Sequence, residues 1–155
     1  MKEQIINGIK YRLNEETLTA AVTCLLAGDS IEDYAGDINI PKIVMFDGVP
    51  YCVTSIDCEA FTDCKSLTSI TIPDSVKVIA NMAFYRCSSL TEITIPNSVK
   101  SLGHNAFSNC ISLEAITYNG TRDKWKKVKK DTLSDKWITG ILAKFVQCTD
   151  GLVKI

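Results

Sequence analysis

The chain has 155 residues, 46% of them hydrophobic and 23% charged, so it can bury a substantial core and is expected to form a single domain, residues 1–155. Its formal net charge of −1 argues against a general polyanion binder, and so against a nucleic-acid partner, because affinity for a phosphate backbone requires a surplus of lysine and arginine. No apolar run approaches the roughly 20 residues that cross a bilayer, so membrane insertion is not expected.

The N-terminus shows no apolar stretch of the kind found in signal peptides. Residues 1–4 are followed by polar Asn7, Lys10 and Arg12, which interrupt every short apolar segment. Two alternatives remain, a cytoplasmic protein or a chain from which an export signal was removed.

Residues 1–50 are predicted to be β structure. Asn7-Gly8 and Asp47-Gly48 each separate two apolar segments, which is typical of a tight hairpin turn. Further strands are predicted at residues 17–23 and 38–40. A hairpin at the open edge of a sheet shields unpaired backbone groups, so we interpret residues 1–50 as an N-terminal β cap.

The middle of the chain repeats itself every 23 residues. Residues 67–89 and 90–112 align without gaps and are identical at 13 of the 23 positions. Partial copies lie on either side of them, because residues 53–66 and 113–118 keep the same apolar positions. The repeat region is therefore predicted to span residues 51–121, with two full and two partial units.

Each unit combines a strand with a turn. In the pattern L-x-x-I-x-I, Ile70 and Ile72 lie two residues apart, which is the period of a strand with one buried face. Pro73 ends the strand, and the following V-x-x-I/L-x-x-x-A-F suits a tight turn and a short second strand or helical segment. One such unit cannot bury its own apolar side, so successive units are predicted to stack. The phenylalanines expected to lie as neighbours are Phe61, Phe84 and Phe107.

Residues 122–155 differ in composition from the repeats, and we interpret them as a mixed C-terminal cap. Trp125 and Val128 lie three residues apart, which suits a short helix that places both on the last repeat. Closing strands are predicted at residues 138–146 and 152–155.

The helix segment carries a run of lysines with two interpretations. It could be a patch for a polyanion or a membrane surface. It could also be a solvated helix face, which is favoured because acidic residues elsewhere balance the charge. The lysines are Lys124, Lys126, Lys127, Lys129 and Lys130.

The repeats resemble the BspA-like leucine-rich repeat. The string L-T-x-I-T-I-P-x-S-V-x-x-I/L-x-x-x-A-F-x-x-C-x-S, at residues 67–89 and 90–112, carries this resemblance. The likeness extends to the family's N-terminal β region and to its terminal cap. The matching segments are residues 7–11, 40–41, 48–51, 116–121 and 148–151, together with Trp125.

The resemblance implies a leucine-rich-repeat solenoid, mainly β and of the α/β leucine-rich-repeat class, with short helical segments. It also implies a bacterial protein, secreted or displayed on the cell surface, that adheres to host or extracellular proteins. The family shares no catalytic residues, so none is carried over. A cytoplasmic location is the alternative, since this chain shows no export signal.

The seven cysteines cannot all be paired within one chain, because their number is odd. Three of them recur every 23 residues and are predicted to stack: Cys64, Cys87 and Cys110. A metal ladder or a disulfide is one interpretation. Buried thiols that fill a small slot are the favoured one. The cysteines that lie off this ladder and could be exposed are Cys24, Cys52 and Cys58.

His104, the only histidine, occupies a variable and outward position of the repeat. A hydrolase triad requires a base, a nucleophile and an orienting acid in contact, and the sequence around His104 does not indicate one. No glycine-rich phosphate-binding string is present either. We therefore predict no enzyme, no cofactor and no metal site.

The outward positions of the repeat strands form the candidate binding face, called the strand face below. It is small and polar and lacks an aromatic or arginine anchor, which indicates weak or multivalent binding. Its residues are Ser69, Thr71, Glu92, Thr94, Ala115 and Thr117.

These features predict a non-enzymatic module for protein binding or adhesion, which presents the strand face to a protein or glycan partner. The alternative is a structural spacer or self-assembly unit of a larger surface protein. The sequence does not define the oligomeric state.

Overall fold

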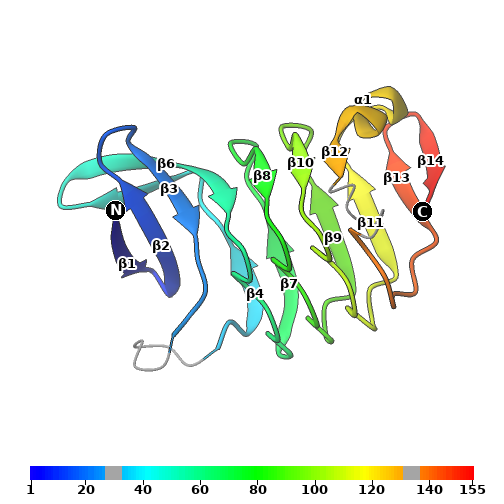
Figure 1. The fold of residues 1–155 in the computed structure, drawn as a ribbon, viewed down its shortest axis with the longest axis horizontal. Helices are drawn as coiled ribbons and strands as arrows, with labels where there is room; N and C mark the ends of the chain where they lie inside the picture. Colours follow the sequence, from blue (N-terminus) through cyan, green and yellow to red (C-terminus); the bar gives the residue numbers. More distant parts are fainter. Residues whose placement is uncertain (27–32, 131–136) are drawn as a thin grey trace.

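The computed structural model describes residues 1–26, 33–130 and 137–155. Strands succeed one another along the long axis of the molecule, with the N-terminus at one end and the C-terminus at the other (Figure 1). Among the described residues, no helix has the length and apolar character needed to cross a membrane.

The N-terminal end is an antiparallel arrangement of β1 (Lys2–Ile6), β2 (Ile9–Asn14) and β3 (Thr19–Val22). The predicted hairpin at Asn7-Gly8 is confirmed. Both turn residues have positive φ, +49° and +78°, which matches the right-handed twist of the strands that they join.

The second predicted hairpin is also present. It joins β5 (Ile43–Phe46) to β6 (Val49–Ile56) through Asp47 and Gly48, whose φ angles are +50° and +76°. Because β6 also pairs with β3, this hairpin belongs to the same sheet as β1 and β2.

From β3 onward this first sheet continues as a parallel stack. β6 pairs with β8 (Val78–Ile79), β8 with β10 (Ser101–Leu102), and β10 with β12 (Lys129–Lys130). Residues one repeat apart therefore lie side by side, as Val78 and Ser101 do.

The L-x-x-I-x-I strands form the second side of each repeat. The first is β7 (Leu67–Thr71), which pairs in parallel with β4 (Gly36–Asn39). The next are β9 (Glu92–Ile95) and β11 (Ala115–Tyr118), followed by β13 (Phe145–Cys148) in parallel and β14 (Gly151–Lys154) in antiparallel pairing.

The A-F segments form a third side made of turns. Backbone N–H groups of alternate residues donate to the next repeat, for example from Glu59, Phe61 and Asp63 to the carbonyls of Asn81, Ala83 and Tyr85. This pattern depends on left-handed residues that recur every 23 positions. They are Glu59, Met82 and Asn105, and four residues further on Asp63, Arg86 and Asn109, with φ between +53° and +61°.

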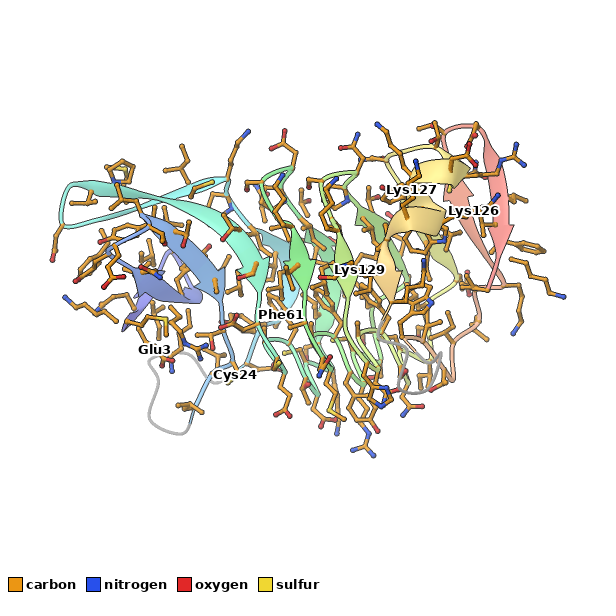
Figure 2. The ribbon with its side chains drawn as sticks, turned by 45° about the horizontal axis from the view of Figure 1, so that its top comes forward. Glu3, Cys24, Phe61, Lys126, Lys127 and Lys129 are labelled. Carbon is orange, nitrogen blue, oxygen red and sulfur yellow. The ribbon has the colours of Figure 1, made fainter. Side chains whose placement is uncertain are left out.

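The core runs between these three sides. Phe61 and Phe84 stack at 5.1 Å between ring centroids with planes 2° apart, and Phe84 and Phe107 stack at 5.1 Å and 4°. All three side chains are buried, and Phe61 is labelled in Figure 2. The predicted stacking of phenylalanines from successive repeats is confirmed.

The helix predicted around Trp125 is α1 (Arg122–Lys127), and it is the one helix of the described residues. The Thr121 hydroxyl accepts a hydrogen bond from the Lys124 N–H at its start. Trp125 and Val128 are buried, and the Trp125 ring lies 5.1 Å from that of Tyr118 and 5.5 Å from that of Trp137.

The strand predicted at residues 138–146 begins only at Phe145. The residues before it continue the third side, because the carbonyls of Trp137 and Thr139 accept hydrogen bonds from the Phe107 and Asn109 N–H groups. The sequence left two alternatives for the second part of each repeat, a short strand or a helical segment. In the described residues of the two full repeats it is a two-residue strand followed by turns.

Candidate functional site

The six residues of the strand face lie on β7, β9 and β11. The β9–β11 register pairs Glu92 with Ala115 and Thr94 with Thr117. Between these positions, Ile93 and Ile116 point to the opposite side and are buried. Period-2 alternation thus separates an apolar inner face from a polar outer one.

A shallow hollow of about 370 Å³ lies over this face. Its walls include Ser69 and Thr71 from β7 and Glu92 and Thr94 from β9, together with Asn119. β7 and β9 are neighbours, yet within the described chain they do not form a hydrogen-bonded ladder. The hollow therefore opens where the sheet is interrupted.

Asp37 fixes one end of the strand face. Its Oδ1 accepts hydrogen bonds from the Ser69 hydroxyl at 2.6 Å and the Thr68 hydroxyl at 3.0 Å. Both hydrogen bonds lower the pKa of the Asp37 carboxyl below its ordinary 3.8, and the bond from Ser69 has the larger effect. Ser69 is therefore oriented by a carboxylate and is only half-exposed.

Strands outside the two full repeats extend the strand face in both directions. On the N-terminal side, Asp37 pairs with Ser69 and Asn39 with Thr71. The sequence carries a signal for this strand, since Ile38-Asn39-Ile40-Pro41 repeats the I-x-I-P of residues 70–73. The two strings lie 32 rather than 23 residues apart, because the β5–β6 hairpin lies between them.

On the C-terminal side, β13 and β14 add residues that sequence reasoning missed. Gln147 lies beside Thr117, and Leu152 lies beside Gln147. Phe145, on the same side of β13, has 47% of its surface exposed, and Leu152 has 55%. An exposed aromatic and an exposed leucine thus border the face. Neither lies on β7, β9 or β11, the strands from which the sequence defined the strand face.

His104 lies in a turn of the third side and is half-exposed. Its ring Nε2 lies 2.8 Å from the Asn105 side-chain nitrogen, and its backbone N–H donates to the Asn81 side-chain oxygen at 2.9 Å. The hydrogen bond to Asn81 connects neighbouring repeats, which is a structural role.

The three ladder cysteines are buried, as predicted. The Cys87 thiol donates to the Phe61 carbonyl at 3.1 Å, and the Cys110 thiol donates to the Phe84 carbonyl at 2.9 Å. Burial raises the pKa of the Cys64 thiol to about 12, and the neighbouring Cys110 thiol together with burial raises that of Cys87 further. The Cys87 and Cys110 thiols therefore each link one repeat to the one before it.

The three off-ladder cysteines differ in exposure. Cys58 is exposed, whereas Cys24 and Cys52 are half-buried. Within the described residues, no group of three or more His, Cys, Asp or Glu side chains is arranged to hold a metal ion.

Comparison with known families identifies the type of repeat in this chain. A family model described as the BspA type leucine rich repeat region, in six copies, matches residues 36–141. The chain belongs to this family, whose members are generally non-enzymatic repeat modules. No curated protein gave a significant match to the sequence.

Solved structures of bacterial leucine-rich-repeat proteins share the fold. One from Bacteroides capillosus has a TM-score of 0.72 and 24% identity, covering 96% of this chain and 99% of its own. One from Bacteroides ovatus has a TM-score of 0.67 and 28% identity, and this chain spans 37% of its length. A leucine rich cell surface protein from Faecalibacterium prausnitzii has a TM-score of 0.61 and 22% identity over 94% of this chain and 45% of its own.

Proposed function

We propose that the chain is a non-enzymatic binding module, secreted or displayed at the cell surface, that uses its strand face for adhesion to a protein or glycan. The observation that carries the proposal is the row of outward, mostly polar side chains on β4, β7, β9, β11 and β13, with a hollow over Ser69, Thr71, Glu92 and Thr94 where the sheet is interrupted between β7 and β9. Exposed Phe145 and Leu152 at its border add apolar surface that a partner could cover.

The surface location rests on relatives. The Faecalibacterium prausnitzii protein is described as a cell surface protein, and another similar structure is a pneumococcal vaccine antigen. Membership in the same repeat family supports an equivalent location for this chain, with a protein as the expected partner class.

We further propose that the repeats form a leucine-rich-repeat solenoid with a cap at each end. Residues 1–50 and 122–155 would supply the N-terminal β cap and the mixed C-terminal cap, with residues 51–121 between them. The antiparallel strands at the two ends, β1–β2 and β13–β14, support this division, because they cover edges that a parallel stack leaves open.

The strand-face proposal is tested by binding to purified extracellular-matrix proteins and mucin glycans immobilised on a sensor. Thr71→Arg with Thr94→Arg, which fills the hollow with two long side chains, should abolish any saturable binding that the native chain shows. Thr91→Arg with Glu114→Arg is the control, since both positions are exposed and lie outside the hollow. Binding that survives the first pair, with an unchanged melting temperature, would contradict the proposal.

A structural spacer or self-assembly unit is the second candidate. Exposed apolar side chains lie at both ends, Ile43 (53% exposed) and Met45 (55%) on β5 and Phe145 (47%) on β13, which favours end-to-end association. Light scattering with and without reductant tests it. A concentration-dependent dimer or longer chain that Met45→Glu disperses would support this candidate, and a monomer under both conditions would exclude it.

A further inference from the structure

The structure brings lysines from three parts of the chain to the outer side of the first sheet. Lys77 and Lys100 come from successive repeats, and the Lys100 N–H donates to the Lys77 carbonyl at 2.7 Å. The Lys129 N–H in turn donates to the Lys100 carbonyl at 2.8 Å. The lysines of α1 and β12, which the sequence shows only as a local run, therefore lie beside lysines of the repeats. Figure 2 shows Lys126, Lys127 and Lys129 at this end of the sheet.

These lysines line two adjoining hollows of about 430 and 830 Å³, which share Lys127 and Val128 in their walls. Together the hollows form what we call the basic groove. In the described part of the chain, its walls contain a single acidic residue, Asp74, although the whole chain has a formal net charge of −1. Its seven lysines are Lys77, Lys100, Lys124, Lys126, Lys127, Lys129 and Lys130.

Most of this charge is not neutralised by the protein. Asp74 pairs with Lys42 at 3.0 Å, outside the groove walls, and Asp123 pairs with Lys126 at 3.7 Å. Among the described residues, no ion pair involves the remaining exposed lysines, which are Lys77, Lys100, Lys124, Lys127 and Lys129. A row of unpaired like charges destabilises the fold slightly, so a ligand that supplies the opposite charge would be favoured.

Lys130 has a different role. Its Nζ donates to the carbonyls of Trp125 at 3.2 Å and Val128 at 3.3 Å, and it lies 4.4 Å from the centroid of the Trp125 ring. These contacts attach α1 to β12. The wall that carries Lys124, Lys126 and Lys127 is therefore held rigidly against the sheet.

We propose that the basic groove binds a linear polyanionic polysaccharide through its sulfate or carboxylate groups. Adjacent parallel strands lie about 4.8 Å apart, so Lys77 and Lys100 present charges in a row that an extended, regularly charged chain can follow. The floor between the lysines contains Val78, 39% exposed, and Ser101, which suit the apolar face and hydroxyl groups of a sugar ring.

The same walls disfavour other polyanions. Proteins that bind single-stranded nucleic acid stack bases on exposed aromatic rings, whereas Tyr118 and Trp125 beside this groove are both 2% exposed. A membrane-surface helix combines basic side chains with apolar ones that enter the lipid, whereas the one apolar residue within α1, Trp125, is buried in the core.

Binding of size-selected heparin oligosaccharides to the 155-residue chain, measured by calorimetry over a salt series, tests the proposal. We expect saturable binding that weakens as salt rises, and a loss of about tenfold in affinity for Lys100→Gln with Lys127→Gln. Lys100→Arg with Lys127→Arg should bind within about twofold of the native chain, because the charge is kept.

The matched control is Lys65→Gln with Lys144→Gln, which removes the same net charge from exposed positions outside the groove. It should leave heparin binding nearly unchanged. An equal loss in the control, no binding at low salt, or equal binding of an uncharged polysaccharide of the same length, such as dextran, would overturn the proposal. Tighter binding of single-stranded DNA of the same charge, or of vesicles rich in anionic lipid, would overturn it in favour of those ligands. Circular dichroism of each variant checks that it is folded.

Discussion

Arg86 holds a left-handed backbone conformation, φ +60°, that residues with a Cβ adopt only at a cost. Its side chain is exposed, contacts the Tyr85 ring at 5.0 Å and reaches Asp63 at 4.0 Å. Such exposed contacts offset only a small part of the cost of the left-handed conformation. Glycine has no such penalty at positive φ.

Arg86→Gly should therefore raise the free energy of unfolding by about 0.5–1 kcal/mol. Urea denaturation measures the change. Lys65→Gly is the control, because Lys65 is equally exposed but lies outside the left-handed region, so glycine should destabilise the fold there. A loss of stability at both positions would show that the turn does not impose the left-handed conformation.

The reactivity of each cysteine thiol should follow from how deeply it is buried. Alkylation requires the thiolate, and burial raises the pKa of Cys64 to about 12 and that of Cys87 above it, whereas Cys58 is exposed. In the native chain at pH 8, Cys58 should react with iodoacetamide first. Mass spectrometry should find Cys64, Cys87 and Cys110 labelled only after denaturation. Rapid labelling of the ladder cysteines would contradict their packing between repeats.

At the scale of single elements, the N-terminal sheet contains a buried charge. Lys10 on β2 is 5% exposed, and its Nζ lies 3.1 Å from the Glu3 carboxylate of β1, labelled in Figure 2. The hydrogen bond from Lys10 is the main reason that the pKa of Glu3 lies below its ordinary 4.5. Since the folded-state pKa is lowered, this interaction stabilises the fold above pH 4.5 and is lost as pH falls through the folded-state pKa.

Glu3→Gln should lower the free energy of unfolding at pH 7 by about 1–2 kcal/mol, a modest value because Glu3 itself is partly exposed. The difference from the native chain should shrink as the pH falls below 4.5 and through the lowered folded-state pKa of Glu3. Urea titrations at pH 7 and pH 3.5 measure this. A difference that is the same at both values would show that the charge of Glu3 does not support Lys10.

Local patterns predicted several elements closely. Asn7-Gly8 and Asp47-Gly48 gave the two hairpins because the required positive φ has a direct sequence signal in these residue types. Three of the left-handed residues of the third side, Glu59, Met82 and Arg86, have no such signal. They are unrelated in chemistry, and their backbone N–H groups donate hydrogen bonds to the next repeat.

The candidate sites were predictable to different degrees. The strand face follows from period-2 alternation within β7, β9 and β11. Its extension by Phe145 and Leu152 could not be foreseen, because residues 138–146 were predicted to be one strand and their true register depends on pairing with β11. The basic groove was predictable only in part, since Lys77 and Lys100 meet α1 through tertiary stacking.

At the scale of the whole molecule, the stability depends on contacts between neighbouring repeats. The rings of Phe61, Phe84 and Phe107 lie in one column, and each repeat contacts chiefly the ones before and after it. In such an arrangement, energetic coupling should fall sharply with repeat separation. The strand face and the basic groove lie on different sheets of this one stack, so a mutation on one should leave binding at the other unchanged.

Double-mutant cycles on the phenylalanine column test the stacking most directly. With leucine substitutions, Phe61 and Phe84 should show a coupling energy of about 0.5–1.5 kcal/mol in urea denaturation, because their rings are in contact. Phe61 and Phe107, two repeats apart, should show coupling within about 0.3–0.5 kcal/mol of zero. Equal coupling in the two pairs, or none between Phe61 and Phe84, would contradict the in-register stack.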